Sequence, residues 1–107
     1  MIEITVINRK IENGLSAVKV EGHSKNITLC NAVSILMKNL EIGFEYASCI
    51  KSESNSVKFN VNRPAPGTFE IYYNNTEYTD FLISVFKQTV NWLINQYPDE
   101  IKIYEVN

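Results

Sequence analysis

The sequence predicts an α+β sandwich in which two helices cover a mostly antiparallel β-sheet, with the elements in the order ββαβββαβ. Apolar residues alternate with polar ones along several short segments and recur at helical spacing along two longer ones. No linker, repeat or low-complexity stretch divides the 107 residues. We therefore expect residues 1–107 to form a single domain.

The chain opens with a predicted β-hairpin. Alternating apolar residues place its strands at about 2–8 and 15–22. Between them lies Asn13-Gly14, a dipeptide typical of tight turns, although the connection after the first strand is longer than two residues.

A helix is predicted next, at about 29–46, with Thr28 as its N-cap and Cys30 in its first turn. The apolar residues that recur at helical spacing are Val33, Leu36, Met37, Leu40 and Phe44.

Three short strands are predicted after this helix, at 49–51, 57–61 and 69–73. Residues 52–56 are polar and predict a turn. Residues 63–67 contain two prolines, which cannot donate to a sheet ladder, and so predict a loop.

A second helix is predicted at about 77–97, ended by Pro98, with a final strand around 101–103. Its apolar stripe is wide, which indicates burial on two sides, against the sheet and against a partner subunit. The stripe consists of Leu82, Val85, Phe86, Val90, Leu93 and Tyr97, widened by Phe81, Ile83, Trp92 and Ile94.

Composition excludes several classes of protein. The chain has 10 Lys and Arg against 12 Asp and Glu, so no basic excess favours nucleic-acid binding. No apolar run approaches the roughly 20 residues of a membrane span, and the first residues lack the features of a signal peptide. Two cysteines and one histidine cannot form a usual zinc site or a disulfide framework. We expect a cytoplasmic protein with reduced thiols and no cofactor.

Two residues suggest chemistry. His23 follows Gly22 at the end of the second predicted strand, and Cys30 opens the first predicted helix. The positive end of a helix dipole favours the thiolate form of a cysteine, which is the nucleophilic form. A neighbouring histidine would act as general base, and free N–H groups of the helix would hold an oxyanion.

Two segments around these residues, Val20–Ser24 and Thr28–Ser34, resemble the ribosomal-processing cysteine protease (Prp) family. Members of that family carry Gly-His-Ala at the end of a strand, then a loop, then Cys-Ala-Ala-Val-Ser at the start of a helix. Here the corresponding residues are Gly-His-Ser and Cys-Asn-Ala-Val-Ser. The resemblance covers nearly the whole chain, including the opening hairpin and the ending Gln96–Ile103.

The resemblance implies a small, cytoplasmic, homodimeric cysteine endopeptidase. Such enzymes trim the N-terminal extension of a large-subunit ribosomal protein, number twenty-seven, after an aromatic pair. Carried over to this sequence, Cys30 would be the nucleophile and His23 the general base. Gly22 would shape the turn before the histidine, and Ser34 would have a supporting role.

The sequence departs from the family pattern at three places. Only Ser24–Leu29 separate the two catalytic candidates, where many members have a longer, glycine-rich loop. Asn26 stands where an Asp is usual, so it would orient the imidazole without supplying a negative charge. Asn31 replaces a small residue after the cysteine, where it would either crowd the site or donate to the oxyanion.

These departures leave other functions open. The main alternative is a non-catalytic homodimeric relative that acts as a binding module in ribosome assembly. A redox-sensing thiol is a weaker alternative, because Cys30 has no resolving cysteine nearby in the sequence. Cys49 is expected to be a core residue.

Aromatic and acidic residues have two interpretations each. The aromatic side chains would line a groove for an aromatic substrate pair, or pack within the sheet and an interface, which we favour. The acidic side chains would form solvated helix faces, or attract a basic substrate segment. The residues concerned are Phe69, Tyr72, Tyr73 and Tyr78, and Glu41, Glu45, Glu77 and Asp80.

Overall fold

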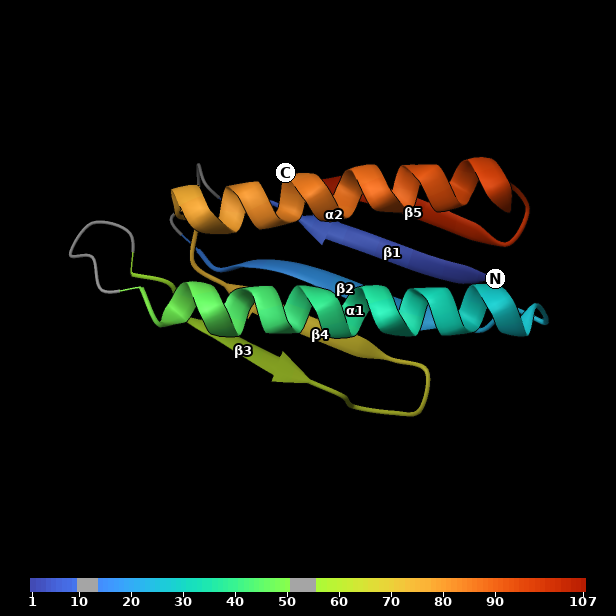
Figure 1. Cartoon of the computed structure of the whole chain (residues 1–107), viewed down its shortest axis with the longest axis horizontal. Coiled ribbons are helices and arrows are strands. Elements are labelled where there is room, and N and C mark those ends of the chain that lie inside the picture. The colour runs from blue at the N-terminus through green and yellow to red at the C-terminus, as the bar shows by residue number, and fades with distance from the viewer. Residues whose placement is uncertain (10–13, 51–55) are drawn as a thin grey trace.

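The computed structural model describes residues 1–9, 14–50 and 56–107, and it confirms the α+β class (Figure 1). The elements follow the order ββαββαβ. They are β1 Ile2–Ile7, β2 Ser16–Gly22, α1 Ile27–Ser48, β3 Phe59–Asn62, β4 Phe69–Tyr73, α2 Glu77–Gln96 and β5 Ile101–Val106.

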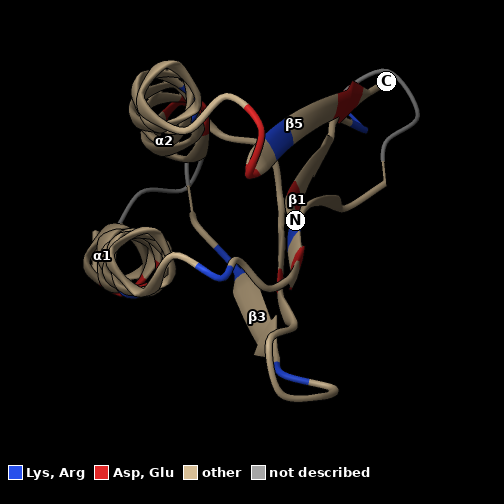
Figure 2. Cartoon of the chain, turned by 90° about the vertical axis from the view of Figure 1, so that its right-hand side faces the viewer, with Lys and Arg blue, Asp and Glu red and all other residues tan. Residues whose placement is uncertain are grey.

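The five strands form one sheet in the order β3-β4-β2-β1-β5. Every neighbouring pair is antiparallel except β1 and β5, where Ile2 lies opposite Ile101. Each helix connects two strands that run in the same direction, β2 to β3 and β4 to β5. These two crossovers proceed in opposite directions along the sheet and start from antiparallel strands. Right-handed crossovers therefore place both helices on one face (Figures 1 and 2).

The core lies between this face and the helices. Phe44 of α1 is fully buried at its centre, and its ring lies 5.6 Å from that of Phe59 and 5.1 Å from that of Tyr73. Ile4 and Ile71 are also fully buried from the sheet side. The apolar side chains that alternate along the strands and those that recur at helical spacing along α1 thus form a single apolar layer.

Among the described residues, α1 is the one helix long and apolar enough to cross a membrane by length and composition. Its apolar residues, however, are part of the core. Leu29, Val33, Leu40 and Phe44 pack in the same cluster as the buried residues of the sheet. A central helix in the core accounts for the composition of α1.

The first helix begins two residues earlier than predicted, at Ile27, and its N-cap is Asn26 rather than Thr28. The Asn26 side-chain oxygen accepts hydrogen bonds from the N–H groups of Thr28 (3.0 Å) and Leu29 (3.2 Å). Asparagine ranks above threonine as an N-cap, which explains the choice between the two candidates.

The strand predicted at 49–51 is wrong at its start. Helix α1 continues to Ser48, and Cys49 is its C-cap, donating from its N–H to the Tyr46 carbonyl (3.1 Å). Cys49 is exposed, so the prediction of a core cysteine is wrong too. A short apolar run cannot be assigned to strand or helix from periodicity alone. Lys51, most of the predicted 52–56 turn and Asn13 lie outside the described residues.

The wide apolar stripe of α2 consists of two parts. Phe86, Val90 and Leu93 are buried against the sheet. Phe81 and Trp92 instead face outward and are 69% and 61% exposed. The core accounts for only the first part, and burial of the second part against a partner subunit stays a prediction.

Replacing Phe44 with alanine is expected to lower the free energy of unfolding by about 3–5 kcal/mol, because a fully buried ring leaves a cavity between helix and sheet. Chemical denaturation measures the change. The exposed neighbour Glu45, changed to alanine, should shift stability by no more than about 0.5 kcal/mol. Equal effects of the two variants would contradict this description of the core.

Candidate active site

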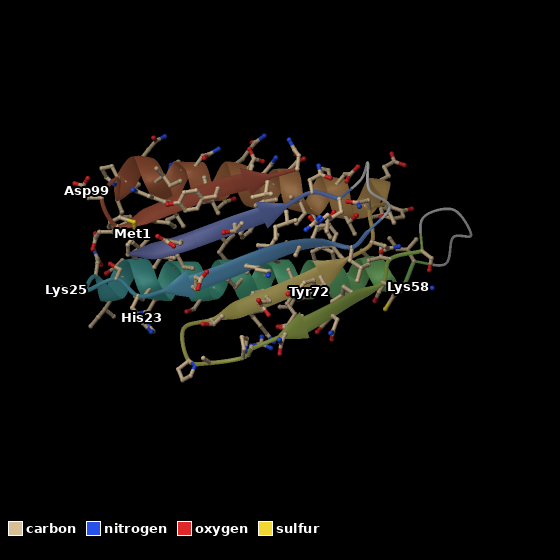
Figure 3. The ribbon with its side chains drawn as sticks, turned by 180° about the vertical axis from the view of Figure 1, so that it is seen from behind. Met1, His23, Lys25, Lys58, Tyr72 and Asp99 are labelled. Carbon is tan, nitrogen blue, oxygen red and sulfur yellow. The ribbon has the colours of Figure 1, made fainter. Side chains whose placement is uncertain are left out.

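The connection between β2 and α1, residues 23–26, carries the first candidate residue and leads directly into the second. His23 follows the last residue of β2, and Cys30 is the fourth residue of α1. His23, Met1 and Lys25 lie at the same end of the molecule (Figure 3). The short β2–α1 connection thus keeps the imidazole and the thiol close to each other in the sequence.

Gly22 determines how the chain leaves β2. Its φ angle is +97°, a conformation that side chains other than hydrogen rarely adopt, and an added Cβ would overlap the Met1 carbonyl. The Met1 nitrogen also donates to the His23 carbonyl (2.7 Å). The chain therefore leaves β2 through a conformation that suits glycine, and the start of β1 contacts it there.

His23 and Cys30 line the same cavity, which has a volume of about 740 Å³. Helix α1 forms one side of this cavity, the segment 63–68 forms another, and the sheet contributes its ends. Of the supporting residues predicted from sequence, Gly22 and Ser34 also line it. The structure thus brings four predicted site residues to one cavity.

The thiol and the imidazole are not hydrogen-bonded to each other. The Cys30 thiol donates to the main-chain carbonyl of Ser24 (3.2 Å). The imidazole of His23 makes no hydrogen bond within the described part of the chain. The thiol proton is therefore held by a main-chain carbonyl and not by a base.

The His23 ring lies directly against Gly67 of the 63–68 segment. A Cβ added at Gly67 would overlap the imidazole, and the residue has a φ of +77°. Only glycine fits this position without strain. The 63–68 segment, which forms this wall of the cavity, therefore contacts the histidine ring closely.

The helix N–H groups expected to hold an oxyanion are already in use. Those of Thr28 and Leu29 donate to the Asn26 side chain, and that of Cys30 donates to the Asn26 carbonyl (3.1 Å). The prediction of free donors beside the thiol is thus wrong for these three groups. An oxyanion at this place would have to displace the cap.

The contacts of Asn26 and the position of Asn31 differ from those that their predicted roles require. The Asn26 oxygen caps the helix, and no hydrogen bond joins it to the imidazole among the residues that the structure describes. Asn31 is exposed and lies outside the cavity lining. Neither crowding nor oxyanion donation by Asn31 gains support from this position.

An ion-pair cluster lies at the end of the cavity away from His23. Arg63 contacts Glu41 at 2.8 Å, Lys38 contacts the same oxygen at 3.5 Å, and the Arg63 guanidinium lies 5.1 Å from the Phe69 ring centre. Burial alone would raise the Glu41 carboxyl pKa, but the hydrogen bond and charge of Arg63, with help from Lys38, lower that pKa overall. Arg63 thereby ties the 63–68 segment to α1.

The acidic and aromatic residues mostly follow their structural interpretation, but Glu41 is buried and paired with Arg63, so the solvated face predicted for it is wrong. No Asp or Glu lines the cavity among the described residues, so attraction of a basic segment by these carboxylates gains no support. Of the aromatic candidates only Phe69 lines the cavity. Tyr73 packs on Phe44, and the Tyr72 ring lies 5.6 Å from the Lys19 ammonium.

Sequence reasoning missed two residues beside the site. The Ser24 hydroxyl donates to the Glu100 carboxylate (2.7 Å) and accepts from the Asn26 N–H (3.0 Å). The local Ser-x-Asn spacing was a signal for the second bond, because serine commonly bonds the N–H two residues on. No sequence signal connects Ser24 with Glu100, 76 positions away.

The sequence matches no known family model and no curated protein. Its fold does match solved structures. An essential ribosomal processing protease, Prp, from S. aureus in complex with a covalently linked product peptide superposes with a TM-score of 0.76 at 16% identity, covering 98% of this chain and 99% of that chain. Prp from S. aureus with a substrate peptide gives 0.72 at 12%, with the same coverage. SMU.848 from Streptococcus mutans gives 0.68 at 22%, covering 99% and 97%. The chain therefore has the Prp fold over nearly its whole length.

Replacing Glu41 with glutamine tests the ion-pair cluster. Because the folded-state pKa of Glu41 lies below its ordinary value of 4.5, the pair stabilises the fold fully above that value. Its contribution disappears as the pH falls through the lowered folded-state pKa. At pH 7 the variant should lose about 1 kcal/mol, a modest amount because Arg63 is half-exposed and screened by water. Urea denaturation at pH 7 and in acid should show the difference from the wild type shrinking in acid. A difference independent of pH would contradict the pair.

Proposed function

We propose that the protein is a cysteine endopeptidase that uses Cys30 as nucleophile and His23 as general base. The observation that carries this proposal is that both side chains line one cavity within the Prp fold. A cavity of about 740 Å³ lies in the range of ligand sites and is large enough for several peptide side chains.

The chemistry follows from the two groups. Cys30 turns from the Ser24 carbonyl toward His23, which takes the thiol proton, and the sulfur attacks the peptide carbonyl carbon. The tetrahedral intermediate collapses to a thioester, and the leaving amine takes the proton from His23. Water, deprotonated by His23, then attacks the thioester. The product acid leaves, and the proton on His23 returns to the sulfur.

The proposed substrate is the N-terminal extension of a large-subunit ribosomal protein, number twenty-seven. The S. aureus Prp structures hold a substrate peptide and a covalently linked product peptide, which supports a peptide as the substrate class. The lining is largely apolar and includes Val33, Met37 and Phe69. Such a surface suits the aromatic pair that the resemblance implies before the cut. The proposed place of action is the cytoplasm.

We also propose that the protein is a homodimer joined through the outer surface of its two helices. Residues spaced by four and seven form an exposed apolar stripe on each helix, and the stripes meet where Gly43 packs against Leu82. None of the stripe residues is charged, which suits a two-fold interface that meets its own copy. The stripe residues are Ile35, Ile42, Tyr46, Phe81, Val85 and Trp92.

Sedimentation velocity at micromolar concentration tests the dimer. The wild type should sediment at twice the 12.3 kDa chain mass. Trp92→Glu should sediment as a monomer, because the dimer would bury an unpaired charge in each copy of the interface. A wild type that sediments only as a 12.3 kDa species would contradict this proposal.

A second candidate function is a non-catalytic relative that binds the same extension. The resting position of the thiol on the Ser24 carbonyl and the occupied helix N–H groups favour this alternative. The absence of an Asp that would orient the imidazole favours it too.

A cleavage assay separates the two functions. The protein is mixed with the extended N-terminal peptide of its own organism's ribosomal protein, and product masses are followed. We expect a single cut after an aromatic pair, reduced at least about 10³-fold in both Cys30→Ala and His23→Ala. The matched control Cys49→Ala removes the other, exposed thiol and should cleave normally. Cleavage that survives Cys30→Ala would contradict the protease. Binding without any cleavage by the wild type would identify the binding module.

A further inference from the structure

We propose that Ser24 and Glu100 form a clamp that positions both candidate catalytic side chains of this chain. The clamp is the hydrogen bond from the Ser24 hydroxyl to the Glu100 carboxylate, at 2.7 Å. Both residues act through their neighbours, so they are positioning residues rather than catalytic ones. The proposal rests on the proposed protease function for its effect on cleavage.

The Ser24 hydroxyl connects two parts of the chain. It donates to Glu100 and accepts from the N–H of Asn26 (3.0 Å), the residue that caps α1. A hydroxyl with both a charged acceptor and a main-chain donor has little rotational freedom. The β2–α1 connection is thus bonded at its second residue to a distant element and at its last residue to the helix.

Two main-chain hydrogen bonds hold Glu100 in position for this bond. Its N–H donates to the Tyr97 carbonyl (3.1 Å), and its carbonyl accepts from the N–H of Ile2 (2.9 Å). The residue therefore joins the end of α2 to the start of β1. The turn between α2 and β5 carries acidic residues (Figure 2), and its Asp99 lies at the same end of the molecule as His23 (Figure 3).

The clamp acts on the thiol and the imidazole through one short segment. The Ser24 carbonyl is the acceptor of the Cys30 thiol (3.2 Å), and His23 is the residue directly before Ser24. Holding Ser24 therefore fixes the resting place of the sulfur and the starting point of the imidazole.

Removal of the clamp should change two rates in opposite directions. Without the clamp, the Ser24 carbonyl is no longer held against the Cys30 thiol, and a small alkylating reagent needs only a thiol released from this acceptor. Alkylation should therefore accelerate about threefold to tenfold, which corresponds to the loss of the one hydrogen bond between thiol and carbonyl. Peptide cleavage needs sulfur and imidazole held together, so kcat should fall about tenfold or more while KM stays within about twofold. Replacing a residue with only a structural role would not lower kcat while leaving KM nearly unchanged.

The experiment uses iodoacetamide and the extended peptide on variants made in a Cys49→Ser background, so that only Cys30 reacts. Ser24→Ala and Glu100→Ala each remove the clamp. Glu100→Gln keeps an acceptor oxygen for the Ser24 hydroxyl and should restore both rates. Glu105→Ala is the matched control, because it removes a carboxylate of β5 that pairs with Lys87 at 2.6 Å instead.

The double variant Ser24→Ala/Glu100→Ala distinguishes the clamp from general loosening. Ser24→Ala also removes the acceptor of the Asn26 N–H, whereas Glu100→Ala removes the clamp alone. Once Ser24 is alanine the clamp is already gone, so the double variant should behave like Ser24→Ala. Loosening of the fold would instead add the two effects and lower the melting temperature further. Alkylation at the wild-type rate in both single variants, or additive effects in the double variant, would overturn the proposal.

The alkylation and cleavage measurements test the clamp and the proposed protease function separately. If the wild type cleaves nothing, the protease proposal fails, while accelerated alkylation in the alanine variants still supports the clamp on the thiol. If the wild type cleaves and the alanine variants alkylate and cleave at the same rates, the clamp is wrong and the protease stands.

Discussion

The shortness of the connection between β2 and α1 is the constraint on which the site depends. It leaves the sheet at Gly22, whose φ of +97° and lack of a side chain allow the turn against β1, and it enters the helix at the Asn26 cap. With its two ends fixed to the sheet and to the helix, the connection has few conformations. His23 and Cys30 consequently line the same cavity without a separate element to bring them together.

The same constraint explains which partners the Cys30 thiol and the first N–H groups of α1 have. The tight path points the Ser24 carbonyl at the Cys30 thiol, which gives the S–H an acceptor other than the imidazole. The Asn26 cap uses the N–H groups that would otherwise face the sulfur. In the proposed reaction, a bound peptide would have to draw the sulfur toward His23, whose ring lies against Gly67. The oxyanion of that reaction and the Asn26 cap would compete for the same helix N–H groups.

Much of the architecture was readable from sequence because period and capping are local properties. The predicted ranges agree with all seven observed elements to within three residues at either end. The error at Cys49 arose because a two-residue apolar run has no period. The two candidate catalytic residues were recognised from Gly-His and Cys-x-Ala-Val-Ser. The contact between Ser24 and Glu100, by contrast, depends on how β5 returns beside β1, which no local pattern encodes.

The central claim is that Cys30 forms a thioester with the N-terminal part of a cleaved peptide, and intact-mass spectrometry tests it most directly. The protein would be mixed with the extended ribosomal-protein peptide and quenched in acid within the first turnover. The account predicts a species heavier than the chain by the N-terminal fragment less one water, attached at Cys30 and absent from Cys30→Ala. Complete cleavage of the peptide with no such adduct at any quench time, or an adduct on Cys49, would contradict it.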